Sequence, residues 1–575
     1  MSHSLQPPDP ALGAVVVVPA RDEIARIGAC LLALSQQQGI ERNSYEVIVV
    51  LDGCQDATYE VVRAVAERDP ALRLHTIELA SPKGVGRARR VAMDLACERL
   101  LGLDRPDGLI ASTDADSIVA NDWLAAQLQL VHQGAEAIGG HIELHSEESD
   151  ALTGEALSER DRRRLRRMDG VLSEQTICAA SEHHQFSGAS LALTAETYLR
   201  CGGLPVRAAL EDEALERELK VRGVPIHRSL SVRVRTSART SGRAPRGLAQ
   251  DLARSDWRAR RSYKANQFPL RRLLEAKSSS IALVLPTREV AATIGVIAAH
   301  AARLRSSGLL DEVLVIDACS RDESARIASE AGLMVVQEDE LSRELGPAHG
   351  KGDAMWRATR VLESEIVAFV DTDSEQFGEH FLTGLLGPLI CDPAVKLVKG
   401  FFQRPFRTQE TLVPHGGGRV TELMARPLLN LHAPELAVFD QPLAGETAAR
   451  RELLERIPFS AGYGVEIAML IDAWRLSGLG SLAQVDLGVR QNRHQSLREL
   501  SAMAYAVLIA AQTRFLGSDF ADAHACGSIS LPAIDDSREM ESRRVTVEER
   551  PPLAEIGEDP GFAHSGPFAS TGQTL

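Results

Sequence analysis

Short apolar runs recur along this chain, and each ends in polar or charged residues. In the first half they lie at residues 15–18, 47–51 and 109–113, and in the second half at 281–285, 313–316 and 366–370. Each run is continuous rather than alternating and is rich in Val and Ile. This pattern predicts parallel strands that helices cover on both faces.

Amphipathic patterns separate these runs, for example at residues 294–304 and 324–331, and they predict helices between the strands. Alternation of strand and helix predicts a doubly wound α/β sheet. Because the second half repeats the order of the first, we expect two tandem α/β domains. The predicted boundaries are 1–235 and 280–532, joined by an Arg-rich helical connector at 236–279 and followed by a polar, disordered tail at 533–575.

The connector region has two interpretations. Residues 228–272 carry many arginines and very few acids, which is typical of a site for an anionic membrane or a phosphate-bearing partner. The same arginines also fit solvated helix faces that close the first domain, and this is the favoured interpretation.

Composition and charge narrow the class of protein. A chain of 575 residues is too long for one hydrophobic core, and its net charge of -15 argues against general nucleic-acid binding. No apolar run approaches the roughly 18–20 residues of a membrane span, and the first ten residues lack the pattern of a secretory signal. The eight cysteines form no C-x-x-C pair, so we expect buried thiols and a cytoplasmic location.

Acidic residues stand where the predicted strands end. Asp371 and Asp373 are two residues apart, as are Asp114 and Asp116 in the first half, and side chains at that spacing on a strand face one side. Ligands of open α/β sheets bind beyond the carboxyl ends of the strands. Two hard oxygen ligands can hold Mg²⁺ or Mn²⁺ against a diphosphate, although an Asp after a strand can instead cap the next helix.

Two further strand-end acids are Asp52 and Asp317. Either can accept hydrogen bonds from a ribose or nucleobase, or can form a turn before a polar loop. The glycines of 84–86 and 350–352 fit neither a Walker nor a dinucleotide fingerprint, which disfavours kinases and dehydrogenases.

The order of these motifs resembles the inverting family-2 glycosyltransferases with the GT-A fold. The first half carries PARDE at 19–23 and STDADS at 112–117. The resemblance implies donor contacts at Pro19, Asp52 and Asp114, and a metal ligand at Asp116. Asp212, in the acidic pair with Glu211, would be the base that deprotonates the acceptor. The alternative is that this pair begins an exposed amphipathic helix.

The second half, about 280–515, resembles glucosyl-3-phosphoglycerate synthase, a retaining enzyme that transfers glucose from UDP-glucose to 3-phosphoglycerate. The resemblance is carried by GKGDAMW (350–356), VDTDS (370–374), LVKGFFQRP (397–405), GGGRVTELMARPLL (416–429), QPLAGE (441–446) and GYGVEI (462–467). Motifs of this length are highly specific.

This second resemblance implies roles for individual residues. Donor contacts would be Pro286, Asp317, Lys351 and Asp371, and Asp373 would hold the metal. Acceptor contacts would be Gly418, Arg419 and Thr421, because a Gly-rich segment exposes backbone amides to an anion and Arg can bind it with two hydrogen bonds. Glu466 would line the sugar side, and Asp373, Glu466, Arg419 and Asp212 are the expected catalytic residues.

Three departures lie on the nucleotide and metal side. Val290 stands at an expected acid, Ala318 replaces a serine, and Asn492 stands at the metal-binding histidine of the family pattern. Asn492 can offer a carbonyl oxygen, and His494 is a second candidate ligand; its alternative is a surface histidine in a basic loop.

We therefore expect a glycosyltransferase that uses Mg²⁺ or Mn²⁺, a nucleotide sugar and phosphoglycerate, with no nucleic-acid partner and no membrane span. A second sugar transfer by the first domain and a homodimer are left open. The alternatives are another donor such as GDP-mannose, another anionic acceptor, or a domain that binds nucleotide sugars without turnover.

Overall fold

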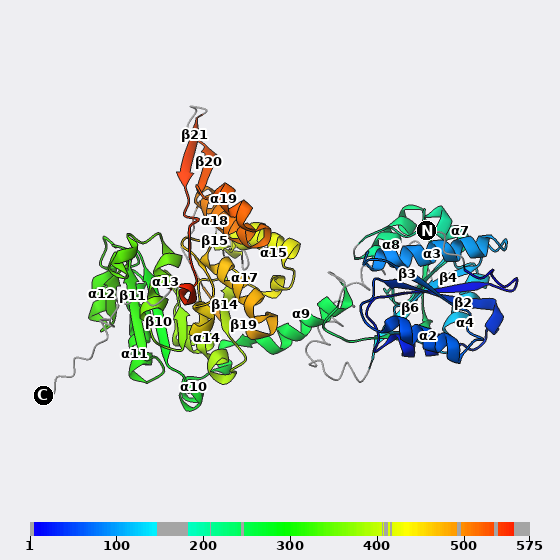
Figure 1. Ribbon diagram of the computed structural model, residues 1–575. Coiled ribbons are helices and arrows are strands. Elements are labelled where there is room, and N and C mark those ends of the chain that lie inside the picture. Colours follow the sequence, from blue (N-terminus) through cyan, green and yellow to red (C-terminus); the bar gives the residue numbers. More distant parts are fainter. Residues whose placement is uncertain are drawn as a thin grey trace. The chain divides into compact units, whose positions relative to one another are not determined.

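A computed structural model describes residues 5–145, 182–207, 209–242, 247–404, 406–407, 412–413, 417–490, 496–533 and 539–556. The chain divides into two compact units, Met1–Ala259 and Arg260–Leu575 (Figure 1). Each unit contains one eight-stranded sheet with helices on its faces. The prediction of two tandem α/β domains is confirmed, and each is described by itself below.

The first sheet has the order β3-β2-β1-β4-β7-β6-β8-β5. The strands β1 to β4 are mutually parallel, and β7 joins β4 in the antiparallel direction. Their bounds are β1 Ala14–Ala20, β2 Tyr45–Asp52, β3 Leu74–Leu79, β4 Leu109–Ser112, β5 Ser117–Val119, β6 Ala137–Leu144, β7 Leu191–Thr194 and β8 Ile226–Thr236.

Alternate residues of β1 enter different cores, which explains its unbroken apolar run. Val16 and Val18 pack in one cluster with α1, α2 and α4, whereas Val15 and Val17 pack in the other with α3, α7 and α8. The helices are α1 Ile27–Ser35, α2 Thr58–Arg68, α3 Val85–Leu101, α4 Trp123–His132, α7 Ala195–Arg200, α8 Glu211–Val221 and α9 Leu248–Arg261. The 3₁₀ helix η1 is Arg42–Ser44.

The second sheet has the order β12-β11-β10-β13-β17-β14-β19-β9, which repeats the first as far as the seventh strand. The eighth strand differs, because β9 runs parallel to β19 whereas β5 runs antiparallel to β8. The strands are β9 Ser262–Lys264, β10 Ile281–Thr287, β11 Glu312–Asp317, β12 Met334–Gln337, β13 Ile366–Phe369, β14 Leu397–Gln403, β17 Thr447–Arg450 and β19 Leu482–Val489.

Helices cover this sheet, and α10, α11, α12 and α14 contribute to one large apolar cluster beneath it. The helices are α10 Leu270–Ala276, α11 Ile294–Ser306, α12 Ser324–Glu330, α13 Lys351–Val361, α14 Glu379–Cys391, α15 Arg426–His432, α16 Arg451–Leu454, α17 Val465–Ser477, α18 Leu497–Leu516 and α19 Ser518–His524. The short helices are η2 Ala265–Gln267, η3 Glu338–Glu340, η4 Arg343–Leu345, η5 Thr421–Ala425, η6 Leu436–Val438, η7 Leu479–Ser481 and η8 Leu553–Glu555. Helices α11 and α12 confirm the two helices predicted in this half.

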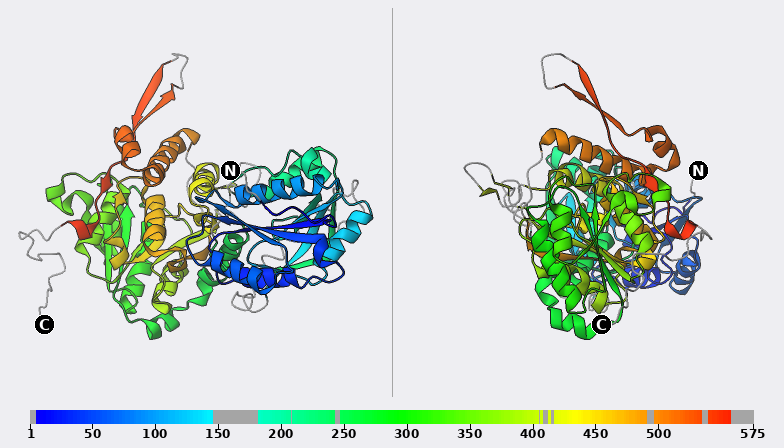
Figure 2. Two further views of the ribbon diagram at one scale, coloured as in Figure 1. Left: turned by 45° about the vertical axis from the view of Figure 1, so that its right-hand side comes forward. Right: turned by 90° about the vertical axis from the view of Figure 1, so that its left-hand side faces the viewer.

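The predicted disordered tail is wrong for residues 540–556. Short strands form there, and β20 and β21 make a hairpin that stands out from the rest of the second unit (Figure 2). β22 then pairs with β18. The remaining strands are β15 Phe406–Arg407, β16 Leu412–Val413, β18 Phe459–Ser460, β20 Ser528–Pro532, β21 Met540–Arg544 and β22 Glu549–Arg550. The local sequence does not indicate this strand, because β22 pairs with a strand that lies about 90 residues earlier in the chain.

The predicted helical connector at 236–279 includes the helices α9 and α10, and its bounds stay a prediction. Helix α9 crosses the division between the units at Ala259, and β9 is an edge strand of the second sheet. Arg228 pairs with Glu216, and Arg261 pairs with Asp392. These pairs support the interpretation of the arginines as part of the folded units.

Two predictions from composition can be compared with the described residues. The seven described cysteines are free, but Cys319, Cys391 and Cys526 are exposed, so the expectation of buried thiols holds only in part. Within the described ranges, no helix combines the length and apolar character that a membrane crossing requires.

Candidate functional site

A lysine joins two carboxylates at the carboxyl end of β13 in the second unit. Lys351 begins α13, and its Nζ lies 2.5 Å from Asp371 Oδ1 and 2.7 Å from Glu466 Oε1. Burial alone would lower the pKa of Lys351, but the two carboxylates outweigh it and raise that pKa, so the ammonium group stays charged. Three residues that the sequence singled out from separate motifs therefore meet at one point.

Arg490, directly after β19, lies on the other side of Asp371. Its Nη2 contacts Asp373 Oδ1 at 2.6 Å and Asp371 Oδ2 at 3.4 Å, and its Nη1 pairs with Glu446. The guanidinium and Glu446 are both almost fully buried, whereas Asp373 is 54% exposed. The two aspartates thus converge on one cation, while the Asp373 carboxylate remains open to solvent and to a ligand.

The pKa of each acid reflects its neighbours. Burial favours the neutral form of Asp371, but Lys351 and Arg490 outweigh it and lower its pKa. Burial raises the pKa of Glu446 despite its pairing with Arg490, and Glu446 Oε2 is a buried atom that makes no hydrogen bond. Arg490 therefore opposes the effect of burial on Glu446, and the stability of this acid's charge depends on that pair.

A second layer of cations lies beneath the acids. Lys399 on β14 is buried, and its Nζ donates to the Ala444 carbonyl at 2.5 Å and to Thr447 Oγ1 at 3.0 Å. Burial lowers the pKa of Lys399 to about 8. Arg404 and Arg490 both lie over the Phe402 ring, at 4.8 and 5.1 Å from its centroid. Together with Lys351, these side chains form a cationic rim next to the carboxylates of the site, and an anionic ligand could bind to it.

The glycine-rich segment begins beside this rim. The Gly417 amide donates to the Arg404 carbonyl at 3.1 Å, and a Cβ on Gly417 would lie 2.5 Å from that of Arg404. Gly418 has a φ of +73°, which favours glycine, and it precedes η5, which begins at Thr421. Arg419 follows Gly418 along the same segment. Asn492 and His494, the remaining metal candidates, lie outside the described residues.

The carboxyl end of β11 in the second unit contains a buried carboxylate oxygen without a hydrogen bond. Asp317 is 1% exposed, and its Oδ2 accepts from the Ser320 amide at 3.0 Å, whereas Oδ1 makes no hydrogen bond. Pro286 lies nearby, because it stands opposite Ile316 in the parallel pairing of β10 and β11, and its carbonyl accepts from Thr372 Oγ1 at 2.8 Å. Val290, which stands where the family pattern has an acid, packs against the apolar core.

The first unit builds a similar bridge with different residues. Arg89 on α3 is buried; it pairs with Asp114 and with Glu211 at the start of α8, and its Nε donates to Ser112 Oγ at 3.1 Å. The two bridging cations stand at different positions of their helices. In the second unit Lys351 is the first residue of α13, whereas α3 begins with Val85 and its cation, Arg89, follows one helical turn later. Glu211 is therefore part of the site and not of an exposed helix face.

Asp116 in the first unit also has a cation. Arg239 Nη2 lies 2.9 Å from Asp116 Oδ2 and 2.8 Å from Glu23 Oε1. Burial and the neighbouring Asp114 raise the pKa of Asp116 to about 6, against the effect of Arg239. Glu23 is the last residue of PARDE, and the equivalent position of the second unit is Val290.

Asp212 and Asp52 have backbone partners. The Gly188 amide donates to Asp212 Oδ2 at 3.1 Å, and the Asp212 charge is near enough to Asp114 to raise the pKa of that acid. Both oxygens of Asp52 accept backbone amides, from Lys83 at 2.7 Å and Gly84 at 2.9 Å. These amides lie 31 and 32 residues further along the chain, so Asp52 links the end of β2 to the segment before α3 instead of forming a local turn. Its oxygens are therefore less available to a nucleoside than those of Asp317. Pro19 lies on β1 opposite Val50.

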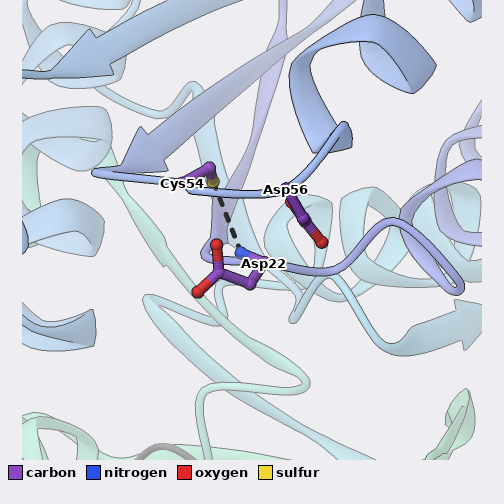
Figure 3. Close-up of side chains that lie close together, drawn as sticks. All are labelled: Asp22, Cys54 and Asp56. Atoms are coloured by element: carbon purple, nitrogen blue, oxygen red, sulfur yellow. Dashed lines mark hydrogen bonds between the residues drawn. The ribbon is translucent and has the colours of Figure 1, made fainter.

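Another acidic group, Asp22, Cys54 and Asp56, joins the loops after β1 and β2 (Figure 3). The Asp22 amide donates to Cys54 Sγ at 3.4 Å, and Asp22 Oδ1 accepts from the Gln55 amide at 2.6 Å. Asp56 Oδ2 accepts from the Ile24 amide at 3.2 Å. Since both carboxylates accept backbone amides, this group fixes the two loops to each other.

Known proteins resemble both parts of the chain. Residues 10–257 match the model of a family described as "Glycosyltransferase like family 2". A glucosyl-3-phosphoglycerate synthase from Petrotoga mobilis is 37% identical over 312 residues, which cover 52% of this chain and 95% of the relative. This chain belongs to the glucosyl-3-phosphoglycerate synthase family. It is a glycosyltransferase, and the match is longer than the first unit, Met1–Ala259, can supply.

Two solved structures are also similar to this glycosyltransferase. A mannosyl-3-phosphoglycerate synthase from Rubrobacter xylanophilus is 40% identical, covers 53% of this chain and 98% of its own, and gives a TM-score of 0.47. A glucosyl-3-phosphoglycerate synthase from Mycobacterium tuberculosis, in complex with Mn²⁺, UDP and glucosyl-3-phosphoglycerate, is 36% identical with a TM-score of 0.44. It covers 50% of this chain and 95% of its own.

Sequence reasoning missed four charged residues of this glycosyltransferase site, namely Lys399, Arg404, Glu446 and Arg490. The first three lie within motifs that carried the family resemblance, and Arg490 served only to locate the expected histidine. A charged residue inside an apolar run, such as Lys399, could have indicated these positions, because charged groups are rarely buried without a partner.

Gly445 offers a test of the Asp371 position. A Cβ at Gly445 would lie 2.2–2.4 Å from the Asp371 carboxylate atoms. We expect Gly445→Ala to fold, because the aspartate side chain can turn away, but to reduce transferase kcat about tenfold or more, since small displacements at a reacting centre are costly. Gly480→Ala, where nothing lies within 4 Å, is the matched control. Equal kcat values for both variants would contradict this position for Asp371.

Proposed function

We propose that the second unit transfers glucose from UDP-glucose to 3-phosphoglycerate with retention of anomeric configuration. The observation that carries the proposal is the charge arrangement at the carboxyl ends of the strands. Lys351 and Arg490 hold Asp371 between them, and the half-exposed Asp373 lies on the solvent side of Arg490. An aspartate pair that can hold a metal, next to the lysine and arginine side chains of the cationic rim, suits a diphosphate donor and an anionic acceptor.

The residues fit a divalent metal. Asp371 and Asp373 both reach one Arg490 nitrogen, so their oxygens lie close enough to share a cation, and carboxylate oxygens are the ligands that Mg²⁺ and Mn²⁺ prefer. Asp373 would hold the metal, with Asn492 or His494 as a further ligand. Bound there, the metal would neutralise charge on the diphosphate leaving group. Mn²⁺ and UDP are also the ligands named for the relative from M. tuberculosis.

The protein's own residues would position the donor. Lys351 fixes the Asp371 and Glu466 carboxylates, and Asp371 would accept a hydrogen bond from a sugar hydroxyl. Lys351 would also contact the diphosphate end of the donor. Asp317 Oδ1, buried and without a hydrogen bond, is the oxygen that would accept one from the nucleoside.

The acceptor would bind on the glycine side. Backbone amides near Gly418, the Arg419 guanidinium and the Thr421 hydroxyl would hold the phosphate and carboxylate of phosphoglycerate. In a retaining transfer, the departing phosphate oxygen can take the acceptor proton from the same face, so the chain supplies position and charge rather than a base.

For the first unit we propose a second sugar transfer, with inversion. Asp212 would deprotonate the acceptor hydroxyl, since it faces Asp114 at the start of α8. Asp114 would contact the donor and Asp116 would hold the metal. The acceptor of this unit stays undefined.

One observation favours a second candidate donor for the second unit. Val290 and Ala318 change two nucleotide-side positions, and the relative from R. xylanophilus is named for mannosyl transfer. GDP-mannose is therefore the alternative donor, with the same acceptor.

A donor panel tests the proposal. Purified full-length protein with 3-phosphoglycerate and Mg²⁺ or Mn²⁺ is given UDP-glucose, GDP-glucose, UDP-mannose or GDP-mannose, and nucleotide release and product are measured. We expect the highest kcat/KM with UDP-glucose and loss of activity with EDTA. Greater activity with GDP-mannose would support the alternative donor, and no release with any donor would refute transfer to phosphoglycerate.

A further inference from the structure

The end of the described chain lies against the helix that carries Lys351. Residues 545–551, here named the C-terminal strap, include β22, which pairs antiparallel with β18 so that Arg550 lies opposite Phe459. The Ala461 amide donates to the Glu548 carbonyl at 2.8 Å. Figure 1 shows the end of this segment in red beside α13.

Arg550 is the strap's link to α13. Its Nε and Nη2 donate to the two Asp353 oxygens at 2.8 and 2.9 Å, an arrangement in which each oxygen receives one hydrogen bond. Its guanidinium lies 5.6 Å from the Trp356 ring centroid, and Trp356 Nε1 donates to the Pro551 carbonyl at 2.8 Å. Both contacts fall within the first two turns of α13.

Asp353 connects this link to the site. It is fully buried in the first turn of α13, two residues after Lys351, and it also accepts from the His349 amide at 2.9 Å. Its own amide donates to the Ala461 carbonyl at 3.1 Å. The loop before the helix and the helix start are therefore both tied to one carboxylate. Two cations pair with it, Arg550 from the strap and the buried Arg357 from α13 itself, whose Nε lies 3.2 Å from Asp353 Oδ1.

The start of α13 is closely packed against the neighbouring backbone. A Cβ on Gly352 would lie 1.9 Å from the Ser460 carbonyl, and one on Gly462 would lie 2.8 Å from the Thr546 carbonyl of the strap. Gly462 comes just before α17, which carries Glu466. The strap thus contacts the two segments that bring Lys351 and Glu466 together.

The first unit has no counterpart to this contact among the residues the structure describes. At the position of Asp353, α3 has the exposed Arg87. Its bridging cation, Arg89, is held inside the unit by Glu211 and Ser112. Lys351, in contrast, is the first residue of α13, so we expect contacts from outside the helix to fix its position.

We propose that Arg550 is a positioning residue of the transferase site, which acts through Asp353 to hold Lys351 between Asp371 and Glu466. This inference rests on the proposed function of the second unit. It assigns the C-terminal strap to the donor side of the site, because its contacts described above reach the segments of Lys351 and Glu466 and not Gly418 or Arg419. Loss of the link is therefore expected to change kcat and donor binding while the KM for phosphoglycerate stays the same.

The test compares variants of the full chain in the transfer assay. For Arg550→Gln we expect kcat to fall about tenfold or more, with the KM for phosphoglycerate unchanged. Arg550→Lys is expected to recover part of kcat, because lysine keeps the charge but loses the paired geometry. Arg544→Gln, on the exposed hairpin, is the matched control with wild-type kcat.

A second variant separates positioning from general stability. Glu549 belongs to the strap but pairs with Arg514 at 2.6 Å, away from α13. Glu549→Gln is expected to lower the melting temperature yet keep kcat. Equal kcat losses in Glu549→Gln and Arg550→Gln, or an unchanged kcat in Arg550→Gln, would overturn the inference. Should Arg550→Gln not fold, Arg550→Lys takes its place. A kcat below that of the wild type would then support the inference, and an unchanged kcat would overturn it. A wild-type protein without transfer activity would refute the proposed function instead.

Discussion

Replacing Arg490 with methionine is expected to remove nearly all transfer activity and to destabilise the second unit. Arg490 is the common partner of Asp371, Asp373 and Glu446. Its loss leaves Glu446 buried without a cation, and breaking such a pair costs about 3–5 kcal/mol of unfolding free energy. Loss of a preorganised charge at a reacting centre typically lowers kcat about 100-fold or more.

The two effects of Arg490→Met can be separated. Adding Glu446→Leu removes the unpaired acid, so the double variant is expected to regain stability but not activity. The sign of the pH dependence follows from Glu446, whose pKa is already raised by burial and rises further without Arg490. A raised folded pKa gives stability that is present at low pH and is lost as pH rises through it, so the loss in the single variant should be larger at neutral than at acidic pH. Denaturant unfolding at both pH values measures this, and equal losses would contradict a buried, ionised Glu446.

Lys351→Met is expected to lower kcat/KM for the donor by about 100-fold. Without the ammonium group, Asp371 and Glu466 lose their shared partner and repel each other. Lys396→Met is the control, since Lys396 pairs with Glu452 at the surface, at 3.2 Å. Steady-state kinetics with varied donor measures the effect. Similar kcat/KM values for the two variants would show that the lysine bridge has no role in the reaction.

The sequence predicted the parts of this molecule that depend on local pattern. Continuous Val-rich runs such as residues 15–18 are determined by burial on both faces, and they became strands. Asp371, Lys351 and Glu466 were each chosen from a separate motif, and the sheet brings them together because the carboxyl ends of its strands share one edge.

The sequence could not predict pairings that depend on distant parts of the fold. Arg490 and Asp373 are 117 residues apart, and Arg550 and Asp353 are 197 apart, so no local spacing indicates either pair. Residues 540–556 are polar, and their composition therefore suggested disorder. In the structure Arg550 pairs with the buried Asp353, and β22 pairs with β18. Asp52 shows the converse: its position at a strand end suggested a nucleoside contact, but the backbone amides of Lys83 and Gly84, in the segment before α3, already occupy both of its carboxylate oxygens.

Formation of glucosyl-3-phosphoglycerate by Asp373→Asn and Asp116→Asn variants tests most directly whether the aspartate cluster of the second unit performs the transfer. Both variants receive UDP-glucose, 3-phosphoglycerate and Mn²⁺, and the product is quantified by mass spectrometry. We expect Asp373→Asn to lose product formation and Asp116→Asn to retain the wild-type rate. Full product formation by Asp373→Asn, with loss in Asp116→Asn, would contradict this and assign the reaction to the first unit.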